Sequence, residues 1–323
     1  MIYPVRKKTL PFRRDKKYME RVAGKKPRKL SNGVYLNNKL VPKAKAKISV
    51  FDHGFLYGDG VYETLRAYKG IVFKIDEHIE RLFCSASMID LKINKTPDKI
   101  KNAVYKTIRT NGHYDAYIRI SISRGPGPLG LDIELCPKPT FLIISNVFKG
   151  HPGQYYKKGV KIAIVDVRRN LKEALNPKIK SHNFLNNILA KIEAKKRGAY
   201  EAIMLNHRGY IAEGTITNIF FVKNNILYTP SPDVGILDGI TRRIILDVAK
   251  ELKIKTREGK FKRRDIYRAD EVFISNTTME IMPVSEVDNI RIRTGTGKIT
   301  GKLHLAYKKK VADYIKENMK NGR

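Results

Sequence analysis

Apolar and polar residues alternate in several short runs, and this period of two indicates β-strands. Such runs occupy 114–123 and 140–145. Pairs of runs separated by Asn, Gly or charged turn residues predict hairpins at 34–41, 202–212 and 218–229. Further strand-like runs cover 62–68, 71–75, 160–167 and 271–275. Strands joined mainly by hairpins predict largely antiparallel sheets.

A spacing of three to four residues between apolar positions predicts helices. One covers 76–89, another follows Thr96-Pro97 and stops at Asn111-Gly112, and a third covers 240–252. A fourth begins near 184 and ends at Gly198, and a fifth begins near 301. The fourth helix has one apolar face, formed by Phe184, Leu185, Ile188, Leu189 and Ile192.

These elements predict an α+β protein with mainly antiparallel sheets and flanking helices, in which the parallel βαβ alternation of a Rossmann domain is missing. A chain of 323 residues exceeds one ordinary core, so we expect two domains. The expected division is a basic flexible tail over 1–32, a small α/β domain over 33–145, a linker over 146–156 and a larger domain over 157–323.

The formal charge of +34 raises the question of nucleic-acid binding. Residues 1–30 contain 12 Lys or Arg and two acidic residues, a net +10, so +24 is spread along the rest. Spread charge argues against a dedicated groove and favours weak, nonspecific phosphate binding at most. The tail lacks the apolar segment of a secretory signal, and its many lysines and few serines fit an organelle transit peptide poorly.

Two cysteines give neither a disulfide framework nor the spacing of a metal site, so we expect no metal and a cytoplasmic location. No run of about 18 apolar residues is present that could cross a membrane.

Lys180 is the strongest candidate for chemistry, because it lies in the irregular segment 177–183, just ahead of a helix. Unpaired backbone N–H groups at a helix start carry a positive field, which favours the neutral form of a nearby amine. A neutral amine can form a Schiff base. Without its context, Lys180 would be read as an ordinary solvated lysine, so the context decides.

An acidic residue and two anion-binding stretches supply that context. Glu213 stands at a strand end, and a carboxylate facing a heteroaromatic nitrogen keeps that nitrogen protonated. Residues 239–241 at a helix start and 275–278 after a strand offer N–H groups and hydroxyls for a phosphate, and Arg81 could add a bidentate contact. Each feature alone also suits a capped helix or a solvated turn. Together they suggest pyridoxal phosphate in the larger domain.

Seven motifs follow one another in order: Tyr57-Gly58-Asp59-Gly60-Val61-Tyr62-Glu63, Glu77-His78-Ile79-Glu80-Arg81-Leu82, Tyr117-Ile118-Arg119, Lys180 to Asn187, Glu213-Gly214 with Asn218, Gly239-Ile240-Thr241-Arg242 and Glu280-Ile281-Met282-Pro283-Val284. This set resembles the class IV (fold type IV) pyridoxal-phosphate aminotransferases, and most of all the branched-chain amino acid aminotransferases. The resemblance runs from about 33 to 320 and leaves only the basic tail uncovered.

The resemblance implies a role for each matching residue. Lys180 would bind the cofactor covalently and move a proton at the substrate Cα, and Glu213 would pair with the pyridine nitrogen. The phosphate would be held by Arg81, Ile240, Thr241, Asn276 and Thr277, with Leu237 packed on the ring. Substrate would be contacted by Tyr57, Tyr62, Arg66, Tyr117, Arg119 and Thr278. Leu129 and Leu131 would reach the neighbouring active site of a homodimer.

The implied reaction moves the amino group of leucine, isoleucine or valine to 2-oxoglutarate. Phe184 departs from the pattern, because the family usually has Tyr there, bonded to the cofactor's phenolic oxygen. Lys178 lies near Lys180, and the choice between them rests on the Lys-Ser-x-Asn spacing.

Substrate identity has two further possibilities within the family. Arg124 resembles the arginine by which D-amino acid relatives bind a substrate carboxylate, whereas Arg119 and 129–132 resemble the branched-chain enzymes. A D-amino acid aminotransferase and an aminodeoxychorismate lyase are therefore alternatives. A basic nucleic-acid-binding protein with an inactive enzyme fold is the alternative of another class.

Overall fold

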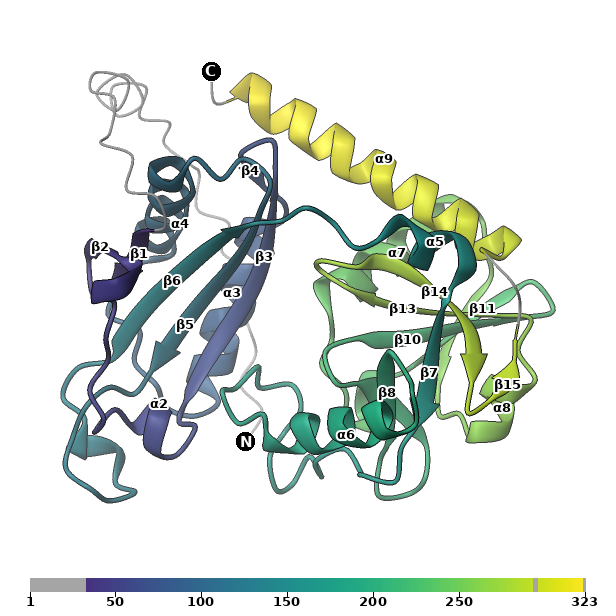
Figure 1. The fold of residues 1–323 in the computed structure, drawn as a ribbon, viewed down its shortest axis with the longest axis horizontal. Helices are drawn as coiled ribbons and strands as arrows, with labels where there is room; N and C mark the ends of the chain where they lie inside the picture. Colours follow the sequence, from purple (N-terminus) through teal and green to yellow (C-terminus); the bar gives the residue numbers. More distant parts are fainter. Residues whose placement is uncertain (1–32, 293–295, 322–323) are drawn as a thin grey trace, which may run out of the picture.

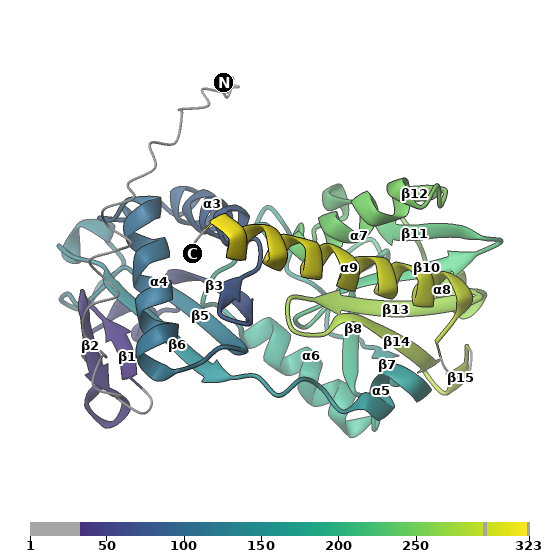
Figure 2. The same ribbon diagram turned by 90° about the horizontal axis from the view of Figure 1, so that it is seen from above.

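The computed structural model describes residues 33–292 and 296–321, which form two sheets side by side with helices around them (Figure 1). The predicted basic tail, 1–32, lies outside the described residues. Helix α9 (Lys298–Asn321) runs past both sheets (Figure 2). Within the described residues, none of the helices combines the length and apolar character needed to cross a membrane.

The first sheet has six antiparallel strands in the order β2-β1-β6-β5-β3-β4. Its strands are β1 (Gly33–Leu36), β2 (Lys39–Pro42), β3 (Gly60–Tyr68), β4 (Ile71–Val72), β5 (Ala116–Ser123) and β6 (Thr140–Val147). Its helices are α2 (His53–Leu56), α3 (Ile75–Ser87) and α4 (Pro97–Asn111). Leu65 and Ile118 of the sheet form one core with Leu82 of α3 and Ile100 of α4.

The second sheet has the order β12-β11-β10-β13-β14-β7-β8-β9, with β15 added on β14. Its strands are β7 (Val160–Ile164), β8 (Glu201–Leu205), β9 (Ile211–Gly214), β10 (Asn218–Lys223), β11 (Ile226–Pro230), β12 (Thr256–Gly259), β13 (Glu271–Asn276), β14 (Glu280–Val287) and β15 (Ile290–Arg291). The accompanying helices are α5 (Gly153–Lys158), α6 (Leu185–Lys196), α7 (Ile240–Glu251), α8 (Arg263–Tyr267) and α9.

The predicted α+β class with mainly antiparallel sheets is confirmed, and the second sheet also contains three parallel pairs: β7 with β8, β7 with β14 and β11 with β12. Strands β7 and β8 are parallel neighbours joined through α6, so this part of the chain is a βαβ unit. Strands β11 and β12 are likewise parallel and joined through α7, but the two units lie apart in the sheet and do not form the repeated βαβ alternation of a Rossmann domain. A long irregular segment, 165–184, separates β7 from α6 and hides the unit in the sequence.

Local signals placed the ends of α4 correctly. The Thr96 hydroxyl accepts a hydrogen bond from Lys99 N (3.3 Å), and Gly112 ends the helix with φ +67°, which favours glycine. The strand expected over 71–75 was wrong beyond Val72. Phe73 leaves the first sheet and packs against Tyr307 and Tyr314 of α9, and α3 begins shortly afterwards.

Helix α6 packs in a way that its apolar pattern does not indicate. Its small residues Ala190 and Ala194 are buried against a cluster from β7 and β8, because small side chains let the helix approach the sheet closely. The apolar face named above lies largely outside this contact. Leu185 is 64% exposed, and Ile188, Leu189 and Ile192 are each about half exposed.

Candidate active site

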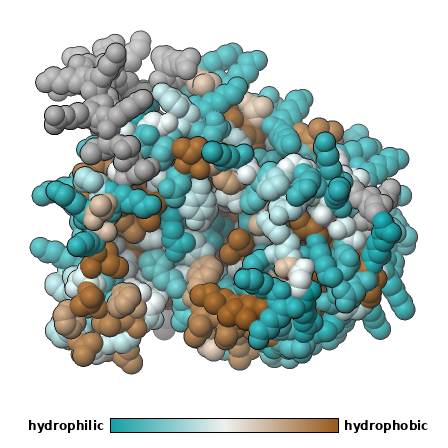
Figure 3. All heavy atoms as spheres, viewed as in Figure 1, coloured by the Kyte–Doolittle hydropathy of each residue, from teal (hydrophilic) through white to brown (hydrophobic). Residues whose placement is uncertain are grey.

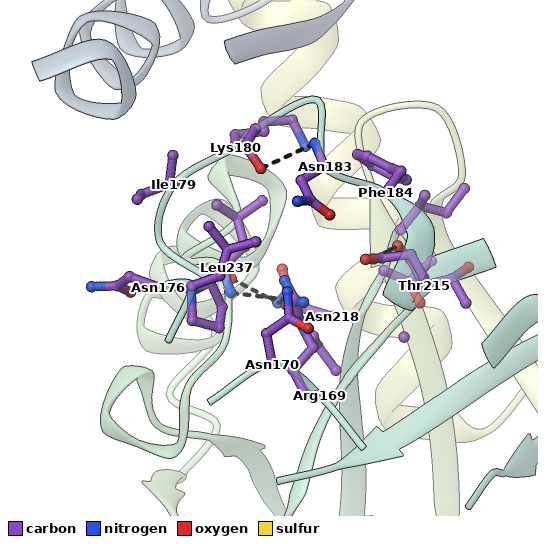
Figure 4. A pocket seen from close by; sticks show the side chains of 18 of the residues that line it. Arg169, Asn170, Asn176, Ile179, Lys180, Asn183, Phe184, Thr215, Asn218 and Leu237 are labelled. Atoms are coloured by element: carbon purple, nitrogen blue, oxygen red, sulfur yellow. Dashed lines mark hydrogen bonds and ion pairs between the residues drawn. The ribbon is translucent and has the colours of Figure 1, made fainter. Parts of the chain in front are cut away.

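Lys180 and Glu213 line the same cavity, which lies between the segment ahead of α6, the end of β9 and the start of β10. Figure 4 shows Lys180, Asn218 and Leu237 around it. The structure thereby brings together the two residues on which the cofactor prediction depends. The other lining residues are Tyr62, Arg169, Asn170, Leu175, Asn176, Pro177, Ile179, Ser181, Asn183, Phe184, Asn187, Gly214, Thr215, Ile216, Thr217, Asn218 and Leu237.

The backbone of Lys180 is fixed from the first sheet. Its carbonyl accepts a hydrogen bond from Tyr62 N (2.9 Å), and its N–H donates to Ser85 Oγ of α3 (3.2 Å). His182 N donates to the Gly60 carbonyl (2.8 Å), so this segment pairs with the start of β3. Helix α6 begins at Leu185, so Lys180 lies ahead of the helix as expected, and β3 supports its backbone.

Gly60 allows this pairing. A Cβ at this position would lie 2.7 Å from the Ile122 carbonyl oxygen and 2.5 Å from His182 Nδ1, so a larger residue would push the segments apart. Lys180 Nζ lies 4.5 Å from the centroid of the Tyr62 ring, a distance typical of a cation–π contact. The amine therefore sits at the cavity edge next to an aromatic side chain.

Glu213 is buried at the end of β9 and held by several donors. Its Oε1 accepts from Arg169 Nε (2.8 Å), and its Oε2 accepts from Leu237 N (3.0 Å) and, at 3.5 Å, from Asn218 Nδ2. Burial raises the pKa of Glu213, while Arg169, the Leu237 N–H and Lys180 oppose the increase. A cationic ring nitrogen against this carboxylate would add further positive charge.

Arg169 is a site residue that sequence reasoning missed. It follows β7 in an irregular segment, lines the cavity and forms the ion pair with Glu213. Nothing in its local pattern separates it from the other 64 Lys and Arg residues. Only the folded chain places it beside a buried carboxylate.

The start of α7 lies next to the cavity, with Leu237 in the wall. Its N-cap, Gly239, offers no side-chain acceptor, so the first helical N–H groups stay available to an anion. A Cβ on Gly239 would lie 2.2 Å from Asn218 Oδ1, which explains the glycine. Arg81 of α3 reaches the same turn, with Nη1 3.1 Å from the Asp238 carbonyl oxygen.

The end of β13 completes this region. The Asn276 side chain caps the following turn, accepting from Thr278 N (3.0 Å) and Met279 N (2.8 Å). Ser275 Oγ is buried without a partner among the described residues. An orphaned hydroxyl and uncapped helical N–H groups fit a phosphate group. Five residues predicted to hold it lie outside the cavity wall, and these roles stay predictions: Arg81, Ile240, Thr241, Asn276 and Thr277.

Among the predicted substrate residues, Tyr62 lines the cavity, and Arg119 lies 3.8 Å from the centroid of its ring. Arg119 and the Lys180 amine thus contact the same aromatic ring. Six others do not line the cavity, and their roles also stay predictions: Tyr57, Arg66, Tyr117, Leu129, Leu131 and Thr278.

Arg124 is committed to the protein itself. It is buried, and Nε and Nη2 form a bidentate pair with Asp59. Nη2 also donates to the Ile89 carbonyl (2.7 Å) and Nη1 to the Asp90 carbonyl (3.1 Å). These contacts engage its fork in holding the start of β3 to the end of α3.

The family model for class IV amino-transferases matches residues 60–287 of this chain. The chain belongs to this family. The matched segment contains the Lys180 and Glu213 cavity and the starts of β3 and α7. Class IV aminotransferases are enzymes that use pyridoxal phosphate, so the predicted enzyme class and cofactor are confirmed.

Three relatives of this class IV aminotransferase carry different names. A protein of Methanocaldococcus jannaschii named "Putative branched-chain-amino-acid aminotransferase" is 45% identical over 276 residues, covering 85% of this chain and 95% of the relative. The aminodeoxychorismate lyase of Bacillus subtilis is 37% identical over 294 residues, 90% of this chain and 98% of the relative. The D-alanine aminotransferase of Listeria monocytogenes is 36% identical over 276 residues, 84% of this chain and 93% of the relative.

Solved structures agree on the fold of this aminotransferase. The Escherichia coli branched-chain amino acid aminotransferase aligns with a TM-score of 0.83 and 31% identity, over 86% of this chain and 93% of that chain. The branched-chain aminotransferase of the archaeon Thermoproteus uzoniensis, solved with norvaline, aligns with a TM-score of 0.81 and 35% identity, over 86% of this chain and 94% of that chain. The predicted fold type IV is therefore confirmed.

In this enzyme Arg66 joins the two sheets. Its Nη1 lies 2.8 Å from Glu280 Oε1, and Tyr68 OH and His304 Nε2 lie 2.9 and 3.2 Å from the same carboxylate. The guanidinium also contacts the rings of Tyr68 and Phe148. Burial alone would raise the pKa of Glu280, but His304, Arg66 and Tyr68 outweigh it and lower the pKa.

Replacing Arg66 with Ala should destabilise the aminotransferase by about 3 kcal/mol at pH 7, because Glu280 would be left buried with a weaker partner set. A carboxyl whose folded pKa is lowered contributes stability above its unfolded pKa and loses it as pH falls through the folded pKa. Urea unfolding of both proteins at pH 7 and pH 3 should therefore show a smaller difference at pH 3. A difference independent of pH would contradict the ion-pair explanation.

Proposed function

We propose that this enzyme transfers the amino group of a branched-chain L-amino acid to 2-oxoglutarate, producing a branched-chain 2-oxo acid and L-glutamate. The observation that carries the proposal is the contrast between two arginines. Arg119 lies beside the Tyr62 ring that Lys180 also contacts, whereas Arg124 is bound to Asp59 and two carbonyls. The arginine in the branched-chain position contacts the same ring as the amine, and the guanidinium in the D-amino acid position is bound within the protein.

Bound pyridoxal phosphate supplies an electron-withdrawing ring that stabilises negative charge at the substrate Cα. In the proposed site, Lys180 removes and returns the proton at Cα. Glu213 holds the ring nitrogen, with Arg169 and the Leu237 N–H fixing the carboxylate. Arg119 binds the substrate carboxylate within reach of the amine.

Apolar side chains in the cavity wall support a branched-chain substrate. Tyr62, Phe184, Leu237, Ile179 and Ile216 line the cavity together with the polar groups. An additional methylene in such a pocket contributes roughly 1–3 kcal/mol to discrimination. The rings of Phe184 and Tyr62 pack edge to face, with their centroids 5.4 Å apart, so Phe184 adds apolar surface where the family usually has a tyrosine hydroxyl.

A homodimer is part of the proposal. The exposed face of α6, formed by Leu185, Ile188, Leu189 and Ile192, corresponds to the hydrophobic patch over α6 in Figure 3. Leu129 and Leu131 are also strongly exposed, as residues that contact a neighbouring subunit would be in an isolated chain. A cytoplasmic location stays a prediction.

The substrate proposal predicts turnover of L-leucine, L-isoleucine and L-valine with 2-oxoglutarate as acceptor. The kcat/KM for D-alanine should be at least about 100-fold lower than for L-leucine, because a single binding position for the substrate carboxylate suits only one enantiomer. The measurement is the rate of each half-reaction in single-turnover absorbance experiments, with aminodeoxychorismate tested for pyruvate release in parallel. Faster reaction with D-alanine, or efficient pyruvate release, would overturn the substrate assignment.

A further inference from the structure

Glu63 is fully buried on β3 and contacts two residues of α3. Its Oε1 accepts from Arg81 Nε (2.6 Å), and its Oε2 accepts from Arg81 Nη2 (2.9 Å) and His78 Nδ1 (2.7 Å). His78 and Arg81 are three residues apart and share a helix face. The carboxylate therefore holds the guanidinium in a bidentate pair and is itself held from the other side.

The charges of this cluster fit that arrangement. Burial alone would raise the pKa of Glu63, but Arg81 and His78 outweigh it and hold the pKa well below its usual range. Burial lowers the pKa of His78, with Glu63 opposing the decrease, so the neutral imidazole donates its Nδ1 hydrogen. The carboxylate is thus ionised with three donors around it.

Arg81 has N–H donors that its contacts with the protein do not use. A guanidinium carries five N–H groups, and Nε, Nη2 and Nη1 each donate one here, to Glu63 twice and to the Asp238 carbonyl. Two N–H donors remain, one on each terminal nitrogen, with no acceptor among the described residues. They are attached to a side chain that already touches the turn leading into α7, where the helical N–H groups are uncapped.

We propose that Glu63, supported by His78, is a positioning residue that holds Arg81 in the orientation in which its free N–H groups bind the cofactor phosphate. This inference rests on the proposed phosphate role of Arg81. Glu63 is fully buried and both of its carboxylate oxygens accept from Arg81, with His78 as the further donor, so we expect it to act on the phosphate only through Arg81. Its effect must therefore be selective for the phosphate group.

The test compares two ligands that differ only in that group, pyridoxal phosphate and pyridoxal. Dissociation constants for both are measured by absorbance titration of the apoenzyme for wild type, Glu63→Gln, His78→Gln and Arg81→Lys. Glutamine keeps the size of Glu63 but turns donors toward a guanidinium. We expect Glu63→Gln to raise the dissociation constant of pyridoxal phosphate at least about 10-fold and that of pyridoxal less than about 2-fold, as loss of a charge-assisted pair predicts.

The double variant Glu63→Gln/Arg81→Lys separates positioning from a general structural role. If Glu63 acts through Arg81, the double variant should bind pyridoxal phosphate no more weakly than Arg81→Lys alone. Equal weakening of both ligands by Glu63→Gln would overturn the inference. An unchanged ligand preference in Arg81→Lys would instead remove the phosphate role of Arg81 itself, which distinguishes the two failures.

Glu271→Gln is the matched control, because Glu271 is also a buried carboxylate but caps α9. It accepts from Ile299 N (3.1 Å) and Thr300 N (2.8 Å). This variant should lose stability without changing the ratio of the two dissociation constants. Circular dichroism of each variant shows whether it is folded, and His78→Gln provides a second, milder perturbation of the same carboxylate. A normal ratio in folded Glu63→Gln and His78→Gln would refute the proposal.

Discussion

Lys180→Ala should lower the transamination rate by about 10⁴-fold, the upper range for removing a positioned proton-transfer group. The reason is geometric: Lys180 is the lysine in the cavity wall, and the backbone bonds of its segment to β3 and Ser85 fix its place in the cavity that Glu213 also lines. The variant should also fail to bind pyridoxal phosphate covalently. The measurements are single-turnover rates with L-leucine and mass spectrometry after borohydride reduction.

Lys178→Ala provides the control for this experiment. Lys178 lies two residues away in the same segment, is exposed and does not line the cavity. The Lys178→Ala variant should still form the covalent adduct, and its rate should stay within about 2-fold of wild type, as expected for a solvated surface substitution. An adduct that persists in Lys180→Ala and disappears in Lys178→Ala would show that the other lysine is the catalytic residue.

The ends of α4 and most strands could be predicted because their signals are local. Thr96 and Gly112 mark the ends of α4 through their own side-chain or backbone conformation. Lys180 and Glu213 could be proposed because their neighbours in sequence form recognisable motifs. The sequence also indicated that both belong to one site, but only the fold shows that the cavity between them is walled by Tyr62 from the other sheet.

Tertiary contacts decided what local signals could not. The apolar stripe on α6 predicts burial, yet the alanines on another face pack against β7 and β8. Arg66 was predicted to contact substrate and Arg169 was not predicted at all, yet Arg66 joins the two sheets through Glu280 and Arg169 holds Glu213. In a chain this rich in arginine and lysine, a role depends on which buried carboxylate the fold brings near.

After Lys180→Ala, substitution of the buried carboxylate Glu213 should have the largest effect on turnover. Replacing it with Gln keeps its size and its contact with the Leu237 N–H, but removes the charge. The substitution should lower kcat/KM by about 10²- to 10³-fold, the range for removing one preorganised electrostatic contact. Covalent cofactor binding through Lys180 should persist, so the two variants differ in mass spectrometry as well as in rate.

Glu201→Gln tests whether burial of a carboxylate near the cavity is enough to explain that loss. Glu201 is at least as buried as Glu213, but accepts from Thr215 Oγ1 (2.6 Å) and Ala202 N (2.9 Å) and does not line the cavity. The Glu201→Gln substitution should therefore reduce stability and leave kcat/KM of the folded enzyme nearly unchanged. Equal losses of kcat/KM in both variants would mean that Glu213 supports the fold and does not face the ring nitrogen. A loss confined to Glu213→Gln would place the charge requirement at the cavity, where the guanidinium of Arg169 would be left without its carboxylate partner.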